Sequence, residues 1–168
     1  GTQYSSPIQI GNPGDWSSSG QYADSTALWV KSNGDLMTWG NWAQGWQSNN
    51  APSVNYSSPI QVAGGQGGMK YDTNEGATLD TWQQKVACSD STWMAINEDG
   101  ELWGGGSYAY GRLGQNQNLP ANVKLSSPVQ VPGTTWRSLS GSGQCGAGVK
   151  SDDSLWVWGR NGFGDLGQ

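Results

Sequence analysis

One six-residue phrase occurs three times in this chain and constrains its fold more than any other feature. It reads SSPIQI at residues 5–10, SSPIQV at 57–62 and SSPVQV at 126–131. Chance does not produce three such copies in 168 residues, and recurrence at a spacing of tens of residues is typical of repeat proteins. We therefore expect successive copies of one supersecondary unit, each burying its apolar faces against its neighbours.

A second repeated stretch lies between these phrases. The residues DDSLWVWGRNGFGDLG at 152–167 align without a gap on DGELWGGGSYAYGRLG at 99–114. They align more loosely on NGDLMTWGNWAQGWQS at 33–48. The alignment divides the chain into three repeats of about 53–66 residues, at approximately 1–48, 49–114 and 115–168.

The second repeat is longer than the other two. From the proline of the phrase to the next recurring tryptophan there are 9 residues in the first repeat, 8 in the third and 23 in the second. The excess of about 14 residues defines an insertion at 63–81. Because loops tolerate added length at little cost, we expect a loop outside the strands, and a deletion of 65–78 that leaves the fold intact.

Each repeat reads as short strands joined by tight turns. Asn33-Gly34 and Asp99-Gly100 separate two strand-like runs, and Asp152-Asp153 stands at the same place in the third repeat. Asn-Gly and Asp-Gly favour the positive φ angles of tight hairpins. No stretch shows an apolar period of 3.6 residues, so the sequence predicts an all-β protein with minimal helix.

The order of these features resembles the regulator-of-chromosome-condensation repeat family. An Asp-Gly turn, a Leu-Trp-x-Trp-Gly strand, an Asn-x-aromatic-Gly-x-Leu-Gly loop and the Ser-Ser-Pro phrase follow one another, most faithfully in the third repeat. The resemblance implies a β-propeller with one four-stranded antiparallel blade per repeat. The form of the repeat is similar to that of microbial and bacteriophage surface or tail proteins. The family commonly has a histidine just after the glycines that open the inner strand, whereas this chain has Thr26, Thr92 and Cys145 there.

Three blades are too few for a propeller ring, which needs about 4–8. The last residues, WGRNGFGDLGQ, and the first, GTQYSSPIQI, would join in register. We expect these blades to be part of a larger propeller; head-to-tail association with copies or other chains, and an open stack, are alternatives. The outward faces should carry Leu36 and Trp39 at one end, and Leu155 and Trp158 at the other, packed against the missing neighbours.

The sequence offers little for catalysis. The absence of His removes the usual general base, metal ligand and triad member. Acidic residues that could form a catalytic pair lie mostly in turns or in the insertion, where they are ordinary: Asp72, Glu75, Asp80, Asp90, Glu98 and Asp99. We therefore expect no catalytic residue, no metal and no cofactor.

Four side chains in the loops after the Trp-Gly strands are candidates for binding a partner. Trp42 and Trp46 break the repeat pattern with large apolar rings, which would be hot spots if exposed. Tyr108 and Arg112 occupy the same loop positions in the second repeat. Structural packing is the alternative for the two tryptophans.

The two cysteines occupy different strand positions in different repeats. Cys88 aligns with Gly141 of the third repeat, and Cys145 aligns with Thr92 of the second. This arrangement predicts two buried free thiols rather than a disulfide.

Charge and composition limit the classes of partner that the chain is expected to bind. The net charge is −5 with 8 Lys and Arg in no cluster, which argues against nucleic acid and chromatin. No apolar run approaches the roughly 20 residues of a membrane helix, so no membrane contact is expected. Expected partners are proteins, either further propeller blades or copies of the chain packing at both ends, and a host-surface protein or glycan.

The leading interpretation is a non-enzymatic β-propeller binding or structural module. By resemblance it would be a virion component, in the tail or on the surface, or an extracellular adhesin. A regulator of a small GTPase and a secreted enzyme inhibitor are the alternatives. A carbohydrate-active enzyme on a propeller is a more distant one.

Overall fold

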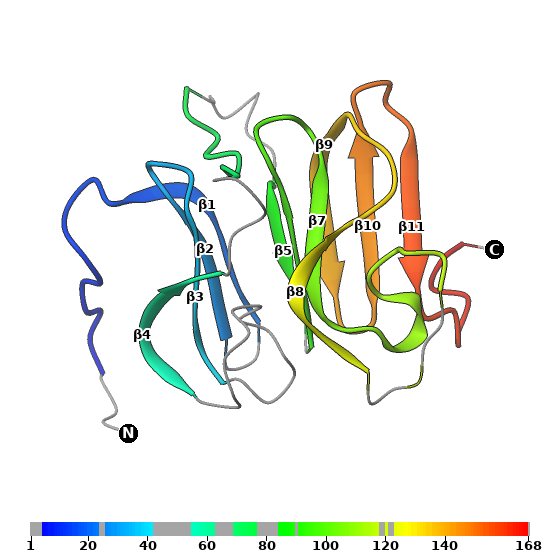
Figure 1. The fold of residues 1–168 in the computed structure, drawn as a ribbon, viewed down its shortest axis with the longest axis horizontal. Helices are drawn as coiled ribbons and strands as arrows, with labels where there is room; N and C mark the ends of the chain where they lie inside the picture. The colour runs from blue at the N-terminus through cyan, green and yellow to red at the C-terminus, as the bar shows by residue number, and fades with distance from the viewer. Residues whose placement is uncertain are drawn as a thin grey trace.

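Three antiparallel sheets stand side by side in the computed structural model (Figure 1). It describes residues 5–23, 26–41, 55–62, 69–76, 84–89, 91–117, 120 and 123–167. Blade 1 contains β1 (Trp16–Ala23), β2 (Thr26–Lys31), β3 (Leu36–Gly40) and β4 (Tyr56–Gln61). Blade 2 contains β5 (Val86–Cys88), β6 (Thr92–Ile96), β7 (Leu102–Ser107) and β8 (Lys124–Gln130). Blade 3 contains β9 (Trp136–Ser142), β10 (Cys145–Lys150) and β11 (Leu155–Gly159).

The prediction of an all-β fold is confirmed. Among the described residues the one helical element is a short 3-10 turn, η1 (Ala109–Gly111). None of the described helical segments has the length and apolar character to cross a membrane. The first strands of the sheets lie next to one another, β1 against β5 and β5 against β9, and the later strands extend outward from them. The sheets are therefore arranged as propeller blades.

The recurring Ser-Ser-Pro phrase ends a sheet rather than opening one. Residues 57–62 and 126–131 supply the outer strands β4 and β8. The Val62 and Val131 amides continue this pairing, because they donate to the carbonyls of Leu36 (2.9 Å) and Leu102 (2.8 Å). Residues 5–10 spell the same phrase but run as an irregular segment beside blade 1 (Figure 1). Sheets and sequence repeats are thus offset by one strand.

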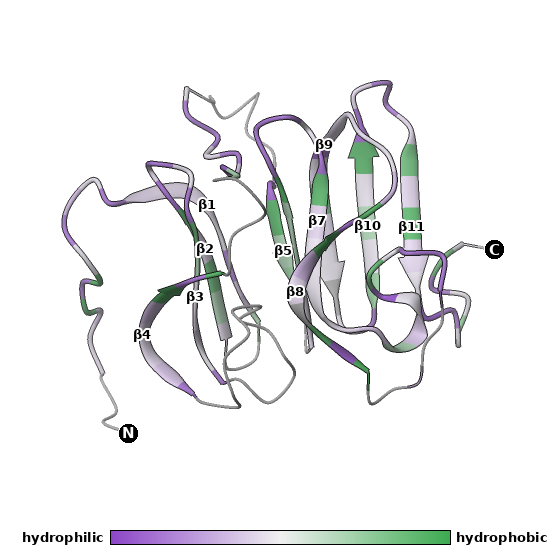
Figure 2. Cartoon of the chain, viewed as in Figure 1, coloured by the Kyte–Doolittle hydropathy of each residue, from purple (hydrophilic) through white to green (hydrophobic). Residues whose placement is uncertain are grey.

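Each sheet has two apolar faces because successive strand residues point to opposite sides. Leu28, Val30 and Leu36 of blade 1 pack with Val86 and Trp93 of blade 2 in one core cluster. The other face of blade 2 meets blade 3 in a second cluster, formed by Ala87, Met94, Ile96, Leu102, Val131, Trp136 and Leu139. The apolar residues accordingly lie along the strands and the polar residues in the connections (Figure 2).

The expectation that Leu36 and Trp39 share an open face was wrong. Leu36 is buried against blade 2, whereas Trp39 lies on the opposite face of blade 1. Two strand residues three positions apart must point to opposite sides, since the side-chain period is two. For the same reason Leu155 is exposed on the open face of blade 3, while Trp158 packs against blade 2.

The insertion in the second repeat connects blades 1 and 2. Tyr71 is buried in the core between these blades, and its amide donates to the carbonyl of Gly34 at 2.9 Å. The Asp72 amide donates to the carbonyl of Ile96 at 3.0 Å. Lys70 forms an ion pair with Asp35 at 2.6 Å, and this bond holds the pKa of that carboxyl below its usual range. The expectation that this stretch is dispensable therefore does not fit residues 69–76.

Tyr71 gives a test of this correction. We expect Tyr71→Ala to lower the free energy of unfolding by about 3–5 kcal/mol, because it opens a cavity between two blades. Tyr71→Phe should be neutral or stabilising, since the buried hydroxyl has no hydrogen-bond partner among the described residues. Urea unfolding measures both changes. Equal losses for the two variants would show that the hydroxyl, rather than ring packing, holds the insertion.

A glycine at or next to the last position of the third strand of each blade is required by local geometry. Gly40, Gly106 and Gly159 have φ angles of 109°, 104° and 111°, which L side chains rarely adopt. A Cβ atom on Gly106 would lie 2.3 Å from the carbonyl oxygen of Ser91. On Gly159 it would lie 2.3 Å from the carbonyl oxygen of Gln144. The glycine repeated at this position thus allows the neighbouring turn to approach.

Substitution of Gly106, compared with a control glycine, should distinguish the cost of the backbone clash from the cost of the positive φ angle. We expect Gly106→Ala to destabilise the chain by more than about 2 kcal/mol in urea unfolding, because strain and a backbone clash add. Gly164→Ala is the matched control, since Gly164 also has positive φ (78°) but a Cβ there meets nothing within 4 Å. It should cost only about 1 kcal/mol. A similar loss in both variants would contradict the role of the contact.

Candidate functional site

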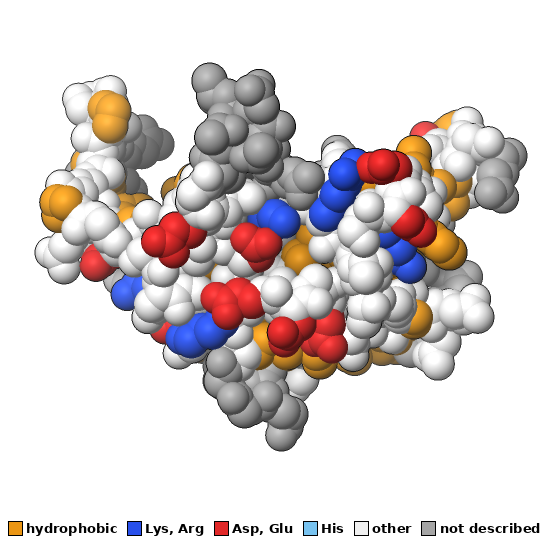
Figure 3. Space-filling model, turned by 90° about the horizontal axis from the view of Figure 1, so that it is seen from above, with side chains coloured by type: hydrophobic (Ala, Val, Ile, Leu, Met, Phe, Trp, Pro, Cys, Tyr) orange, Lys and Arg blue, Asp and Glu red, His pale blue; other side chains and the backbone are white. Residues whose placement is uncertain are grey.

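The two ends of the strands differ in chemistry. The β2–β3, β6–β7 and β10–β11 hairpin turns and residues 69–76 share one side of the blades, which we call the turn side. Many charged side chains gather there (Figure 3). Its carboxylates include Asp35, Asp72, Glu75, Glu98, Asp99, Glu101, Asp152 and Asp153. The opposite side, the loop side, carries the longer connections that follow the Trp-Gly strands.

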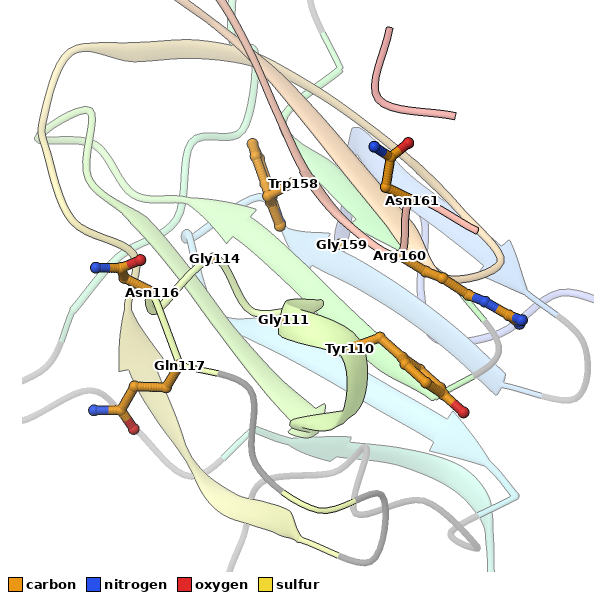
Figure 4. A pocket seen from close by; sticks show the side chains of 9 residues that line it. All are labelled: Tyr110, Gly111, Gly114, Asn116, Gln117, Trp158, Gly159, Arg160 and Asn161. Atoms are coloured by element: carbon orange, nitrogen blue, oxygen red, sulfur yellow. The ribbon is translucent and has the colours of Figure 1, made fainter. Parts of the chain in front are cut away.

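The candidate site is a groove of about 570 Å³ on the loop side. It lies between the β7–β8 loop of blade 2 and the chain that leaves β11 of blade 3 (Figure 4). Its lining residues are Tyr110, Gly111, Gly114, Asn116, Gln117, Trp158, Gly159, Arg160 and Asn161. None of these nine is acidic, so the groove offers aromatic faces, amides and a cation.

Trp158 joins the two walls of the groove. Its indole N–H donates to the carbonyl of Arg112 at 2.9 Å, which connects blade 3 to the β7–β8 loop. The same loop is held from the other side, because the Arg112 guanidinium donates to the hydroxyl of Ser91. The Asn161 side-chain oxygen accepts the Leu166 amide at 3.2 Å and shapes the far wall. Both walls are therefore fixed by hydrogen bonds.

Arg160 and two aromatic rings form the exposed part of the site. The guanidinium carbon of Arg160 lies 5.3 Å from the ring centroid of Tyr110 and 6.0 Å from that of Phe163. One of its nitrogens donates to the side-chain oxygen of Gln144 at 3.1 Å. Tyr110 and Phe163 are 45% and 89% exposed. The arrangement presents a cation flanked by apolar rings to solvent, which suits an acceptor-bearing, partly apolar ligand.

The structure does not place the four candidate partner-binding residues as the sequence analysis expected. Tyr108 and Arg112 are only 7% and 9% exposed, so they support the β7–β8 loop and offer a partner little surface. Trp42 and Trp46 lie outside the described residues. The exposed residues Tyr110, Arg160 and Phe163 were not among the candidates. Tyr110 and Phe163 hold the aromatic position of the repeated loop, so they did not stand out from the repeat pattern as Trp42 and Trp46 did.

The carboxylates and thiols on the described part of the chain form no metal site. No cluster of three or more His, Cys, Asp or Glu side chains is found there that could hold a metal. Asp72 pairs with Lys85 at 2.9 Å, and Asp153 pairs with Arg137 at 2.6 Å. These carboxylates are therefore engaged in ion pairs on the turn side.

The two cysteines are free, as the alignment predicted. Cys88 is buried between blades 1 and 2, and burial raises the pKa of its thiol to about 12. Cys145 differs from the prediction, because it is only half-buried; its thiol lies 3.1 Å from the carbonyl oxygen of Arg160, to which it donates. The position after a strand-end hairpin leaves one side of this thiol open to solvent.

Thiol labelling should distinguish these environments. At pH 8 a maleimide reagent is expected to modify one thiol per folded chain, that of Cys145, because Cys88 is buried and burial raises its pKa, whereas Cys145 is only half-buried. Both thiols should react in denaturant. Cys145→Ser is the control and should abolish labelling of the folded chain. Rapid labelling of that variant would show that the core between blades 1 and 2 opens readily.

Comparisons with known proteins agree with this architecture. No protein-family model and no curated protein sequence matches the chain. Human WBSCR16 matches in structure with a TM-score of 0.67 and 20% identity, over 85% of this chain and 33% of that protein. Prp20p from Saccharomyces cerevisiae matches with a TM-score of 0.63 and 12% identity, over 89% of this chain and 34% of that one. The chain has the fold of RCC1-type propeller blades.

A further structure, yeast RCC1 (Prp20) bound by Kap60, gives a TM-score of 0.60 at 12% identity. It covers 83% of this chain and 31% of that protein. This chain therefore spans about a third of the length of the solved structures that it matches. At these identities the likeness concerns the fold.

Proposed function

We propose that the chain is a non-enzymatic β-propeller module that binds a protein partner through its loop-side groove. The observation that carries this proposal is the exposed Tyr110–Arg160–Phe163 stack beside the groove. Tyr and Arg are enriched among the residues that dominate binding energy at protein interfaces. Exposed aromatic rings of this kind have a high cost in water unless a partner covers them.

The chemistry of the groove favours a partner segment that bears carboxylates next to apolar side chains. Arg160 can donate to a carboxylate while its guanidinium remains stacked on the rings. The amides of Asn116, Gln117 and Asn161 add donors and acceptors around it. The module as a whole is acidic, with a net charge of −5, so this groove is a local exception to its charge.

The setting that we propose is a virion surface or tail, or an extracellular adhesin. The support for it is the resemblance of the repeats to those of microbial and phage surface proteins, together with a charged fraction of only 12%. Partner binding by a rigid scaffold through its loops suits such a role.

A small-GTPase regulator is the second candidate. Prp20p, which shares the fold, is described by its binding properties to Gsp1p and histones. The two chains are 12% identical, so this comparison concerns the fold. Which partner this chain binds depends on the residues of its own loops.

A peptide array and a glycan array, probed with the labelled chain, test the proposal. We expect binding to peptides in which Glu or Asp neighbours an aromatic residue, and a roughly tenfold loss of signal for Arg160→Ala and for Phe163→Ala. Arg160→Lys should lose part of the signal, because it keeps the charge but not the planar guanidinium.

Arg137→Ala is the matched control, since it removes the same charge on the turn side, where Arg137 pairs with Asp153. It should leave peptide binding unchanged. Binding to glycans alone, or equal losses for the Arg137 and Arg160 variants, would contradict the proposed partner class.

A further inference from the structure

A second pocket lies on the turn side, away from the loop-side groove. Its volume is about 230 Å³. The start of β1, the β2–β3 turn and the insertion contribute to its lining. The lining residues are Trp16, Ser17, Ser18, Ser32, Thr73, Asn74 and Glu75. None of these seven lines the loop-side groove, so the two sites are separate.

The strand wall of the pocket is a wide bulge in β1. Between the pairs Trp16–Lys31 and Gly20–Trp29, three residues of β1 stand opposite one residue of β2. At the same place in β9 the pairing skips residue 137 alone. Bulges change the direction of side chains and are common beside functional sites. The wider bulge of β1 therefore places the two serines of this strand that line the pocket.

The insertion forms the other wall, and hydrogen bonds hold it in place. The Asn74 backbone amide donates to the Asp72 carboxylate at 2.8 Å, which closes a tight turn. The Asn74 side chain donates to the hydroxyl of the buried Ser19 at 3.3 Å. The Ser18 hydroxyl lies 3.5 Å from the carbonyl oxygen of Thr73, to which it donates. The pocket is thus formed in the free chain, which lowers the entropic cost of binding a ligand there.

The segment that builds this wall is additional to the repeat. Blades 2 and 3 are joined by residues 131–135, so a blade junction forms without such an insertion. Within the insertion, Tyr71 packs in the core between blades 1 and 2, whereas residues 73–75 line the pocket. The core packing explains Tyr71, and residues 73–75 are left as the part of the insertion that serves the pocket.

The lining combines one aromatic ring with many small polar groups. The indole N–H of Trp16 already donates to the Ile10 carbonyl at 2.7 Å, so this side chain offers the pocket apolar surface rather than a donor. The other six lining residues carry hydroxyl, amide or carboxylate groups. A sugar ring requires this combination, because its C–H groups pack against apolar surface while its hydroxyls donate and accept hydrogen bonds.

Size and charge limit the ligand further. The volume of about 230 Å³ is below the roughly 300–1,000 Å³ of pockets for drug-sized ligands, so it suits a single ring. Glu75 is the one charged residue among the described lining residues. The Lys31 ammonium lies 5.9 Å from the centroid of the Trp16 ring, but Lys31 does not line the pocket. An anionic ligand would therefore be repelled, whereas a neutral sugar can donate to the carboxylate.

We propose that this pocket binds one uncharged sugar ring of a glycan. Glu75 accepts hydrogen bonds from ring hydroxyls, and Trp16 packs against the C–H groups of the ring. The serine, threonine and asparagine side chains around them fix the orientation of the sugar. This inference goes beyond the proposed function, because it adds a ligand of another class on the opposite side of the blades.

Saturation-transfer NMR of the 168-residue chain tests the class of ligand. The probes are neutral methyl hexosides and methyl N-acetylhexosaminides, with methyl glucuronide and open-chain sorbitol for comparison. We expect transfer to at least one neutral glycoside and none to the other two, because Glu75 repels the carboxylate of the glucuronide and sorbitol lacks a ring. Transfer to no neutral glycoside, or equal transfer to sorbitol or the glucuronide, would overturn the proposal.

Substitutions locate the bound sugar. Glu75→Ala should weaken binding of the glycoside about tenfold, because it removes the acceptor carboxylate. Glu98→Ala is the matched control and should leave binding unchanged, since Glu98 is also exposed on the turn side but lies outside the pocket. Equal losses for these two variants would contradict the site. Arg160→Ala should keep sugar binding while it loses peptide binding; loss of the sugar in this variant would place it in the loop-side groove instead.

Discussion

The two-residue period of the β-strand is the constraint on which this structure depends. It gives every sheet two apolar faces, so every sheet needs a neighbour on each side. Blade 2 has both neighbours, and Leu102 at its junction with blade 3 is fully buried. Leu155 holds the same position in blade 3 and is 68% exposed. The difference in exposure between these two leucines shows how much burial a neighbouring blade provides.

Large indole rings fit between the blades because glycine stands opposite them. A Cβ atom on Gly146 or on Gly148 would lie 2.6 Å from the Trp158 ring or 2.7 Å from the Trp136 ring. In blade 1 the same relation joins Gly20 and Trp29. In each pair, the glycine has no side chain, and the indole ring of the neighbouring strand fills the space that a side chain would take. The packing density is therefore kept. At these three positions the high contents of Gly and Trp, 27 and 11 residues in the whole sequence, are therefore linked by packing.

The repeat could be predicted from the sequence, but the limits of each sheet could not. The tight turns and the strands beside them could be predicted, because Asn-Gly and Asp-Gly determine the backbone conformation of the turn in which they lie. The Ser-Ser-Pro phrase was assigned to the start of a repeat, since a period has no intrinsic first residue; its pairing with the preceding third strand is a long-range contact. The role of Tyr71 was missed for the same reason. Tyr110 and Phe163 were missed because a regular position in a repeat gives no signal of exposure.

The loop-side groove exists only where two blades meet. Its walls come from consecutive blades, and the Trp158–Arg112 hydrogen bond that joins them is itself a contact between blades. The same scaffold recurs from blade to blade, while the residues of each loop decide which groove binds a partner.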